Sequence, residues 1–326
     1  MKLSVVICTY NGEKYIEEQI KSIIYQTKKI DEIVLCDDRS NDKTVKIASE
    51  ILSTCDIPYL IEVNSTNLGV VKNFEKAIGL TTGDIIFFSD QDDVWKSHKV
   101  ELIVSKFEND NSCVMVFSDA DLVDKNRNKI GSKLWETLRF SISEFRKKDF
   151  TEILLNRCVV TGATMAIKRN LYINSLPFNE CWLHDGWVAI NASLHGKVIA
   201  IDQSLIEYRQ HGGNVIGAVK LNPIERIKKY IKVINYLESE RKIRLDRYTA
   251  FYNYGNAIMN SYIKQKVIEC VNFWKDLDSL RSKGIFEGIR VIFYNLLNGN
   301  YKKYYTGLRG AIRDIAYLIT RKTGEL

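Results

Sequence analysis

The sequence has little of what marks a secreted, disulfide-bonded or membrane-spanning protein. Its 326 residues include only 3 Pro and are 45% apolar, so the chain is expected to be globular rather than disordered. The 7 Cys form no close pairs, which is not the pattern of a disulfide framework. No run of about 18 apolar residues occurs, so no spanning helix is expected. An apolar segment begins at Leu3 with no signal peptide before it, and we therefore expect a reducing, cytoplasmic location.

A glycine-rich phosphate-binding loop is also missing. The first apolar segment, residues 3–8, is followed by Thr9, Tyr10, Asn11 and Gly12, which have neither GxGxxG nor GxxxxGK[ST] spacing. This argues against a dinucleotide-dependent enzyme and against a P-loop NTPase. Any phosphates bound here would have to be handled by a metal ion instead.

Charge is distributed unevenly along the chain. Residues 1–219 hold 26 Lys or Arg and 30 Asp or Glu, whereas residues 220–326 hold 21 and 10. A near-neutral body followed by a basic tail suggests an anionic surface as partner, either a membrane or a nucleic acid.

Short apolar runs alternate with helical periodicity through the first part of the chain. Runs of this length are typical of buried parallel strands, and apolar residues spaced three and four apart are typical of helices packed on them. The alternation predicts a parallel α/β sheet covered on both faces. Expected strands are 3–8, 33–36, 57–63 and 85–88, and expected helices follow each of the first three.

Three carboxylates follow the strand expected at 85–88. Asp90 and Asp92 form an Asp-x-Asp pair, and Asp93 comes next. Burying so much like charge is costly, so these side chains should lie beyond the end of the strand. Such a pair can share Mg²⁺ or Mn²⁺, although an acidic turn that caps the next helix is an alternative.

Polar residues end two further expected strands, at 9–11 and 37–40. Since parallel strands bring their carboxyl ends to the same edge of a sheet, hydroxyls, amides and carboxylates should gather there. That collection suits a nucleotide-and-metal site.

Four elements in this order resemble the family 2 glycosyltransferases of the GT-A fold. They are residues 9–12, the Asp-Asp-Arg-Ser-Asn-Asp at 37–42, the Asn-Leu-Gly at 67–69 and the Asp-Gln-Asp-Asp at 90–93. The resemblance covers about residues 1–215. It departs from the family at Arg39, where Gly is usual, so we expect this turn to lack a positive φ.

Three segments resemble the bacterial rhamnosyltransferase-like branch of that family: 89–95, 184–187 and 208–214. The resemblance implies a metal-dependent inverting glycosyltransferase that builds cell-surface polysaccharide. The donor would be dTDP-rhamnose or a UDP-hexose, and the acceptor a lipid-linked or growing glycan. A nucleotidyltransferase is an alternative, but such enzymes usually have an early glycine-rich loop.

The resemblance also implies roles for individual residues. Asp185, at the start of a helix expected over 186–194, would be the general base, and capping that helix is its alternative role. Asp92 is the first choice for a direct metal ligand, with Asp90 and His211 as others. Arg209, His211 or Trp187 would contact the diphosphate or the acceptor. Residues expected to bind the donor nucleotide are Thr9, Tyr10, Asn11, Asp38, Asn67, Lys72, Asp90 and Gln91.

The chain is expected to divide into a catalytic domain at 1–218 and a helical, aromatic-rich region at 219–326. Basic and aromatic residues mixed on helices fit a peripheral protein on the inner face of a membrane. Alternatively, these aromatics pack on the catalytic domain or contact a protein partner, such as a second copy in a homo-oligomer. No nucleic-acid-binding motif supports a nucleic-acid partner. The aromatic residues concerned are Phe286, Phe293, Tyr294, Tyr301, Tyr304, Tyr305 and Tyr317.

Overall fold

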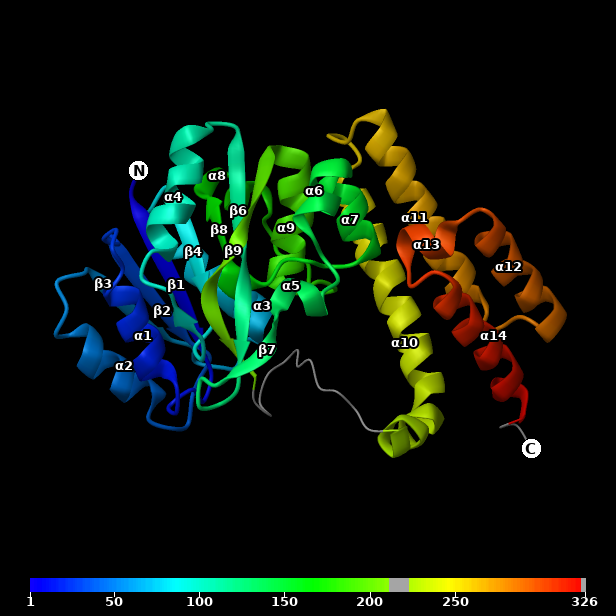
Figure 1. Cartoon of the computed structure of the whole chain (residues 1–326), viewed down its shortest axis with the longest axis horizontal. Coiled ribbons are helices and arrows are strands. Elements are labelled where there is room, and N and C mark those ends of the chain that lie inside the picture. Colours follow the sequence, from blue (N-terminus) through cyan, green and yellow to red (C-terminus); the bar gives the residue numbers. More distant parts are fainter. Residues whose placement is uncertain (211–222, 324–326) are drawn as a thin grey trace. The chain divides into compact units, whose positions relative to one another are not determined.

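Figure 1 shows the computed structural model of the chain, which describes residues 1–210 and 223–323. The chain groups into two compact units. The first unit is Met1–Lys148 with Val159–Ala218, and the second is Asp149–Cys158 with Val219–Leu326. A short segment from the middle of the sequence is therefore grouped with the C-terminal helices. The expected division into domains after residue 218 stays a prediction.

The first unit is built on a sheet that has nine strands in the described part of the chain. Its order is β3-β2-β1-β4-β8-β6-β9-β5, and β7 pairs with β6. β1 to β4 pair in parallel, whereas β8 runs antiparallel to both β4 and β6. The strands are β1 (Leu3–Thr9), β2 (Glu32–Asp37), β3 (Tyr59–Val63), β4 (Ile85–Ser89), β5 (Val94–Trp95), β6 (Cys113–Val123), β7 (Lys129–Lys133), β8 (Met165–Lys168) and β9 (Lys197–Arg209).

Helices cover both faces of this sheet, which is why every residue of β1 and β4 is buried. Val5 and Phe87 share a core with apolar residues of α1, α2 and α4. On the other face, Phe74 of α3 stacks on Phe88 of β4. The predicted α/β architecture is confirmed. The helices are α1 (Ile16–Ile24), α2 (Thr44–Leu52), α3 (Val70–Gly79), α4 (Lys99–Asn109), α5 (Leu134–Thr137), α6 (Ile142–Lys147), α8 (Arg169–Asn174), α9 (His184–His195) and the 3₁₀ turn η1 (Gly162–Thr164).

The strand order reverses next to β1. The chain runs from β1 outward through β2 to β3, and then returns to place β4 on the other side of β1. In open α/β sheets, ligands bind beyond the carboxyl ends of the strands at such a switch point. Because β8 is antiparallel to β4, the turn η1 that precedes it lies at this same edge.

The second unit is helical, as the sequence predicts. Its core contains the fully buried Trp274 and Phe273, which contact each other edge to face. None of the described helices is both long and apolar enough to cross a membrane. The helices are α7 (Phe150–Asn156), α10 (Pro223–Gly255), α11 (Ser261–Ser279), α12 (Ile285–Leu297), α13 (Asn300–Tyr304) and α14 (Leu308–Thr323).

Candidate active site

The acidic loop joins β4 to β5 at the switch-point edge. Asp93 is 1% exposed, and its Oδ1 accepts a 3.0 Å hydrogen bond from the backbone N of Arg209. Its Oδ2 is buried and has no hydrogen-bond partner among the described residues. A buried carboxylate oxygen without a hydrogen bond lowers stability, so its presence points to a functional role such as binding a ligand.

The carboxylates of the loop repel one another. The pKa of Asp90 is raised to about 7, mainly by burial and then by the charges of Asp92 and Asp185. The pKa of Asp93 is also raised well above its usual value, by burial and by Asp92 and Asp90. The loop therefore holds more negative charge than its surroundings offset, and a bound cation would relieve the repulsion.

Asp185 faces this loop from the first turn of α9. Its Oδ2 accepts a 3.2 Å hydrogen bond from the backbone N of Gly162 in η1. Leu183 occupies the N-cap position of α9. The capping role considered for Asp185 is therefore wrong, because Asp185 is the second residue of the helix.

A buried lysine interacts with the carboxylates of the loop. Lys99 is fully buried, and its Nζ donates a 2.7 Å hydrogen bond to the carbonyl oxygen of Ala163 in η1. Nζ also lies 3.6 Å from the ring centroid of Trp95. Burial lowers the pKa of Lys99, whereas the charges of Asp93 and Asp90 raise it. Lys99 thus links the helix after the acidic loop to the turn that holds Asp185.

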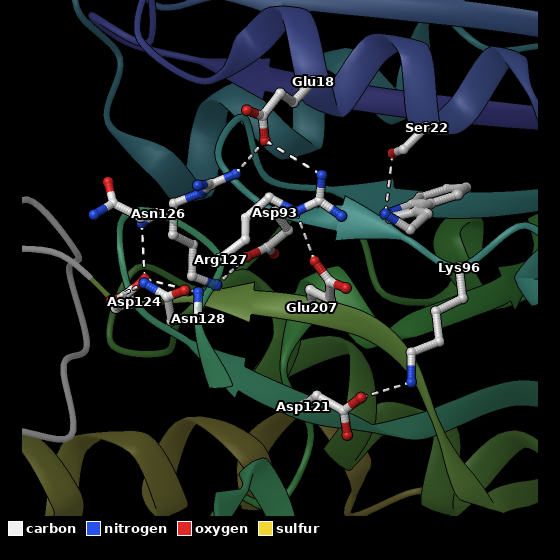
Figure 2. A network of polar contacts seen from close by, with 12 residues as sticks. Glu18, Ser22, Asp93, Lys96, Asp121, Asp124, Asn126, Arg127, Asn128 and Glu207 are labelled. Atoms are coloured by element: carbon white, nitrogen blue, oxygen red, sulfur yellow. Dashed lines mark hydrogen bonds and ion pairs between the residues drawn. The ribbon is translucent and has the colours of Figure 1, made fainter. Parts of the chain in front are cut away.

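Arg209, at the end of β9, holds the acidic loop from the other side. It is almost fully buried, and its Nε donates to the carbonyl oxygen of Asp92 at 2.7 Å. Its Nη1 donates to the carbonyl oxygen of Lys125 and its Nη2 to Glu18, each at 2.7 Å. Figure 2 shows Glu18 between two arginines, the second being Arg127. These contacts make Arg209 a positioning residue, and its expected contact with a diphosphate or acceptor stays a prediction.

Asp38 closes the loop before α3. Its Oδ1 accepts from the backbone N of Leu68 at 2.7 Å and its Oδ2 from that of Gly69 at 2.9 Å. The side-chain amide of Asn67 donates to the Asp38 carbonyl oxygen at 3.2 Å. Asp38 and Asn67 are thus brought together, and base recognition by Asp38 would have to use its remaining acceptor capacity.

The ends of β1 and β4 are joined through one amide. The side chain of Gln91 accepts from the backbone N of Tyr10 at 2.8 Å and donates to its carbonyl oxygen at 3.0 Å. The ring of Tyr10 stays half exposed. Asn11, at φ 51°, accepts from the backbone N of Asn41. Thr9 is buried and donates to Asp37 at 2.7 Å. Of these residues, Tyr10 offers the exposed aromatic ring that could stack on a base.

Three further residues are predicted to bind substrate or metal. Lys72 on α3 pairs with Glu75, with 3.2 Å between Nζ and Oε2. Trp187 is buried, and its Nε1 donates to the carbonyl oxygen of Ser175 at 2.7 Å. His211 lies outside the described residues. The roles of all three in binding stay predictions, and Trp187 is placed among core residues.

The expectation for Arg39 is wrong. Its φ is 68°, the left-handed conformation that the family's usual Gly would adopt. The side chain of Asp37 imposes it, because Oδ1 accepts from the backbone N of Ser40 at 2.7 Å and Oδ2 from its hydroxyl at 2.6 Å. The turn therefore keeps the conformation it would have with Gly, and the left-handed backbone of Arg39 costs about 1–2 kcal/mol of stability.

The acidic loop has the chemistry, but only part of the ligand set, that a divalent cation needs. Carboxylate oxygens suit Mg²⁺ and Mn²⁺. Across residues 1–210 and 223–323, no three His, Cys, Asp or Glu side chains are grouped to hold a metal. Mg²⁺ commonly takes one or two carboxylates and completes its shell with substrate phosphates and water. Asp90 and Asp92 fit that arrangement.

Sequence reasoning missed Lys99 and Glu18 at this site. Lys99 carried a signal, because it shares helical spacing with the buried Ile103 and Phe107 and so had to point inward. Glu18 carried none, since it lies on the exposed side of α1 and its partner Arg209 is 191 residues away.

Comparison with known proteins agrees with this geometry. Residues 4–174 match the model of glycosyl transferase family 2. An uncharacterized glycosyltransferase of Haemophilus influenzae is 31% identical over 75% of this chain and 76% of its own length. A dTDP-rhamnosyl transferase of Shigella flexneri is 30% identical over 65% of this chain and 74% of its own length. The crystal structure of Staphylococcus aureus TarS 1–349 with UDP-GlcNAc has the same fold, with a TM-score of 0.56 at 18% identity, over 99% of this chain and 92% of that one.

The sheet with its switch point and the likeness to TarS place the first unit in the GT-A fold class. More narrowly, the chain belongs to glycosyltransferase family 2, and it is an enzyme that moves a sugar from a nucleotide-sugar donor.

Proposed function

We propose that this enzyme transfers rhamnose from dTDP-rhamnose, with inversion, to a hydroxyl of a lipid-linked or growing cell-surface glycan. The observation that carries the proposal is the convergence of Asp90, Asp92 and Asp185 at one sheet edge, where their charges interact. The relative from Shigella flexneri favours dTDP-rhamnose as donor. Transfer from a UDP-hexose is the second candidate, favoured by the UDP-GlcNAc complex of the TarS neighbour.

The donor nucleotide would lie over the ends of β1 and β2. Tyr10 has the exposed ring for stacking on a pyrimidine base. Thr9, Asn11, Asp38 and Asn67 shape the two loops around it. Lys72 would reach a base or phosphate oxygen only by giving up part of its contact with Glu75. Gln91 holds the acidic loop against the end of β1, and the ribose would lie beside it.

The diphosphate would lie over the acidic loop. Asp92, with help from Asp90, would hold Mg²⁺ or Mn²⁺, which stabilises the negative charge of the leaving diphosphate as a Lewis acid. Arg209 keeps the loop in place through the Asp92 carbonyl. His211 stays a candidate for an additional ligand or diphosphate contact.

Asp185 would act as general base. Its carboxylate takes the proton from the acceptor hydroxyl while that oxygen attacks the anomeric carbon of the sugar. The bond from this carbon to the diphosphate oxygen breaks, and the nucleoside diphosphate leaves with the bonding electrons. One displacement inverts the anomeric centre and needs no covalent enzyme intermediate. The Gly162 amide orients the base.

The most informative test is a panel of nucleotide sugars, with and without EDTA, scored for hydrolysis and for thermal shift. We expect dTDP-rhamnose to give the largest effects, and EDTA to remove them. Asp92→Ala should abolish metal-dependent donor binding, whereas the exposed control Asp202→Ala should not. A UDP-hexose as best substrate would favour the second candidate, and turnover undiminished by EDTA would contradict the metal's role.

Such an acceptor would place the enzyme on the cytoplasmic face of the membrane as a peripheral protein. The basic helical region supports this location, because cationic surfaces are attracted to anionic lipid. The buried thiols Cys8, Cys36, Cys113 and Cys270 are consistent with a reducing compartment.

A further inference from the structure

The aromatic residues of the second unit fall into two sets. Tyr301, Tyr304, Tyr305 and Tyr317 are buried. Their hydroxyls bond within the unit, as Tyr301 does to Asp314 at 2.7 Å and Tyr304 to Glu269 at 2.9 Å. These four residues therefore build the bundle and are not available to a partner.

Helix α12 has the opposite character on its outer side. Phe286 is 87% exposed, Phe293 50% and Leu297 84%. With Arg290 they are spaced four, three and four residues apart, which places them along one stripe of the helix. We name Phe286, Arg290, Phe293 and Leu297 the α12 stripe. Large apolar side chains exposed to this degree in one line mark an interaction surface.

The orientation of the α12 stripe is fixed by packing on the other side of the helix. Gly288 and Ile292 face the bundle and are buried. A Cβ at Gly288 would lie 2.5 Å from the Leu318 side chain of α14, so the two helices approach closely there. Figure 1 shows α12 and α14 side by side. The stripe cannot turn inward unless this contact is lost.

The segment that contains the stripe is rich in basic residues. Residues 281–313 hold seven Lys or Arg and one acidic residue, Glu287. Four of these cations pair with carboxylates, as Arg281 does with Asp278 and Arg313 with Glu240, whereas Arg290 lies exposed within the stripe. Helix α14, packed on α12, adds its own exposed apolar residues, Leu308, Ile312 and Ile319. Apolar residues that enter a bilayer, flanked by cations at headgroup level, are the pattern of an interfacial helix.

We propose that the α12 stripe docks this enzyme on a bilayer that contains anionic lipid. The proposal rests on the proposed function, because it supplies the surface on which a lipid-linked acceptor is presented. A second copy of the chain fits less well, since a symmetric contact through the stripe would bring two Arg290 side chains together. A protein partner would need an acidic, apolar groove to match.

The test measures cosedimentation of the full chain with vesicles of phosphatidylcholine alone and of phosphatidylcholine with phosphatidylglycerol. We expect binding to the anionic vesicles that falls with salt. The triple variant Phe286→Ser, Phe293→Ser, Leu297→Ser should bind about tenfold or more weakly, and Arg290→Gln about fivefold. The control Tyr25→Ser, Ile173→Ser replaces exposed apolar residues of the first unit and should bind normally.

Donor hydrolysis without vesicles separates this proposal from the proposed function. A triple variant that keeps its melting temperature and its hydrolysis rate but leaves the vesicles supports docking. Equal binding of wild type and triple variant to anionic vesicles would overturn it, as would failure of the wild type to bind them. If the wild type did not bind vesicles and the triple variant had half the particle mass of the wild type in solution, the stripe would instead be a dimer interface. Absence of hydrolysis with every nucleotide sugar would instead contradict the proposed function.

Discussion

Lys99 Nζ donates a 2.7 Å hydrogen bond to the carbonyl oxygen of Ala163, and this bond connects the two halves of the candidate active site. Lys99 begins the helix that follows the acidic loop. Ala163 lies in the turn whose Gly162 amide holds Asp185. The acidic loop and Asp185 are thereby connected through a buried side chain.

Lys99→Met should therefore destabilise the protein and disturb the site. It leaves the buried Ala163 carbonyl oxygen without its donor and removes the lysine that lies beside the carboxylates, so we expect a loss of about 3 kcal/mol in the free energy of unfolding. Urea denaturation measures it. Lys168→Met is the matched control, because Lys168 donates to the Asn111 carbonyl oxygen at 2.7 Å from a position that is only partly buried. It should change stability by less than about 0.5 kcal/mol. Equal effects would mean that burial of Lys99 is unimportant.

Arg209→Lys should loosen the acidic loop. Lysine cannot reproduce three separately directed donors, so the bond to Asp92 or one of the others is lost. We expect a decrease of about 2 kcal/mol in stability and weaker Mn²⁺ binding, measured by calorimetry. Arg127→Lys alters the same network from a side chain that is 43% exposed and should cost less than about 1 kcal/mol. Unchanged Mn²⁺ affinity in Arg209→Lys would refute its positioning role.

Stability should depend on pH through Asp90. Its pKa is raised to about 7 in the folded protein, first by burial and then by Asp92 and Asp185. The folded state thus keeps a proton that the unfolded chain loses near pH 4, and the free energy of unfolding should fall as the pH rises from about 4 to about 7. Melting curves should show this fall in metal-free wild type and a smaller one in Asp90→Asn. Added Mg²⁺ should reduce it, and identical pH profiles for the two proteins would count against the raised pKa.

Gly162→Ala should impair turnover more than donor binding. A Cβ there would lie 2.6 Å from His184 Nε2, so the turn or the start of α9 must shift and move Asp185. We expect kcat to fall about tenfold or more with donor affinity nearly unchanged. Gly284→Ala is the control, since a Cβ at Gly284 meets nothing within 4 Å. A fall in donor affinity alone would show that η1 serves the nucleotide instead of the base.

The sequence was sufficient for features that depend on local pattern. The strand at β4 and the carboxylates after it follow from an apolar run that ends in charge. The same reasoning failed where a residue's conformation or burial depends on contacts with other parts of the chain. The positive φ of Arg39 comes from the hydrogen bonds between Asp37 and Ser40. Because Arg stands where the family usually has Gly, this conformation was not evident from the sequence. Trp187 stands in a polar motif, yet its ring packs in the core because Ser175 provides its acceptor.

The three hydrogen bonds of the Arg209 side chain show most clearly what the sequence could not predict. Their acceptors come from α1, the β4–β5 loop and the turn between β6 and β7, which are far apart in sequence. No periodicity relates these segments, so only the folded chain reveals that a residue expected to bind substrate also holds the acidic loop.

Single-turnover transfer by Asp185→Asn, measured beside donor affinity, tests the central claim most directly. Asparagine keeps the shape of the side chain and an acceptor for the Gly162 amide but cannot take a proton. The account predicts a transfer rate lower by about 10²–10⁴-fold with donor affinity little changed. Transfer at close to the wild-type rate would contradict it.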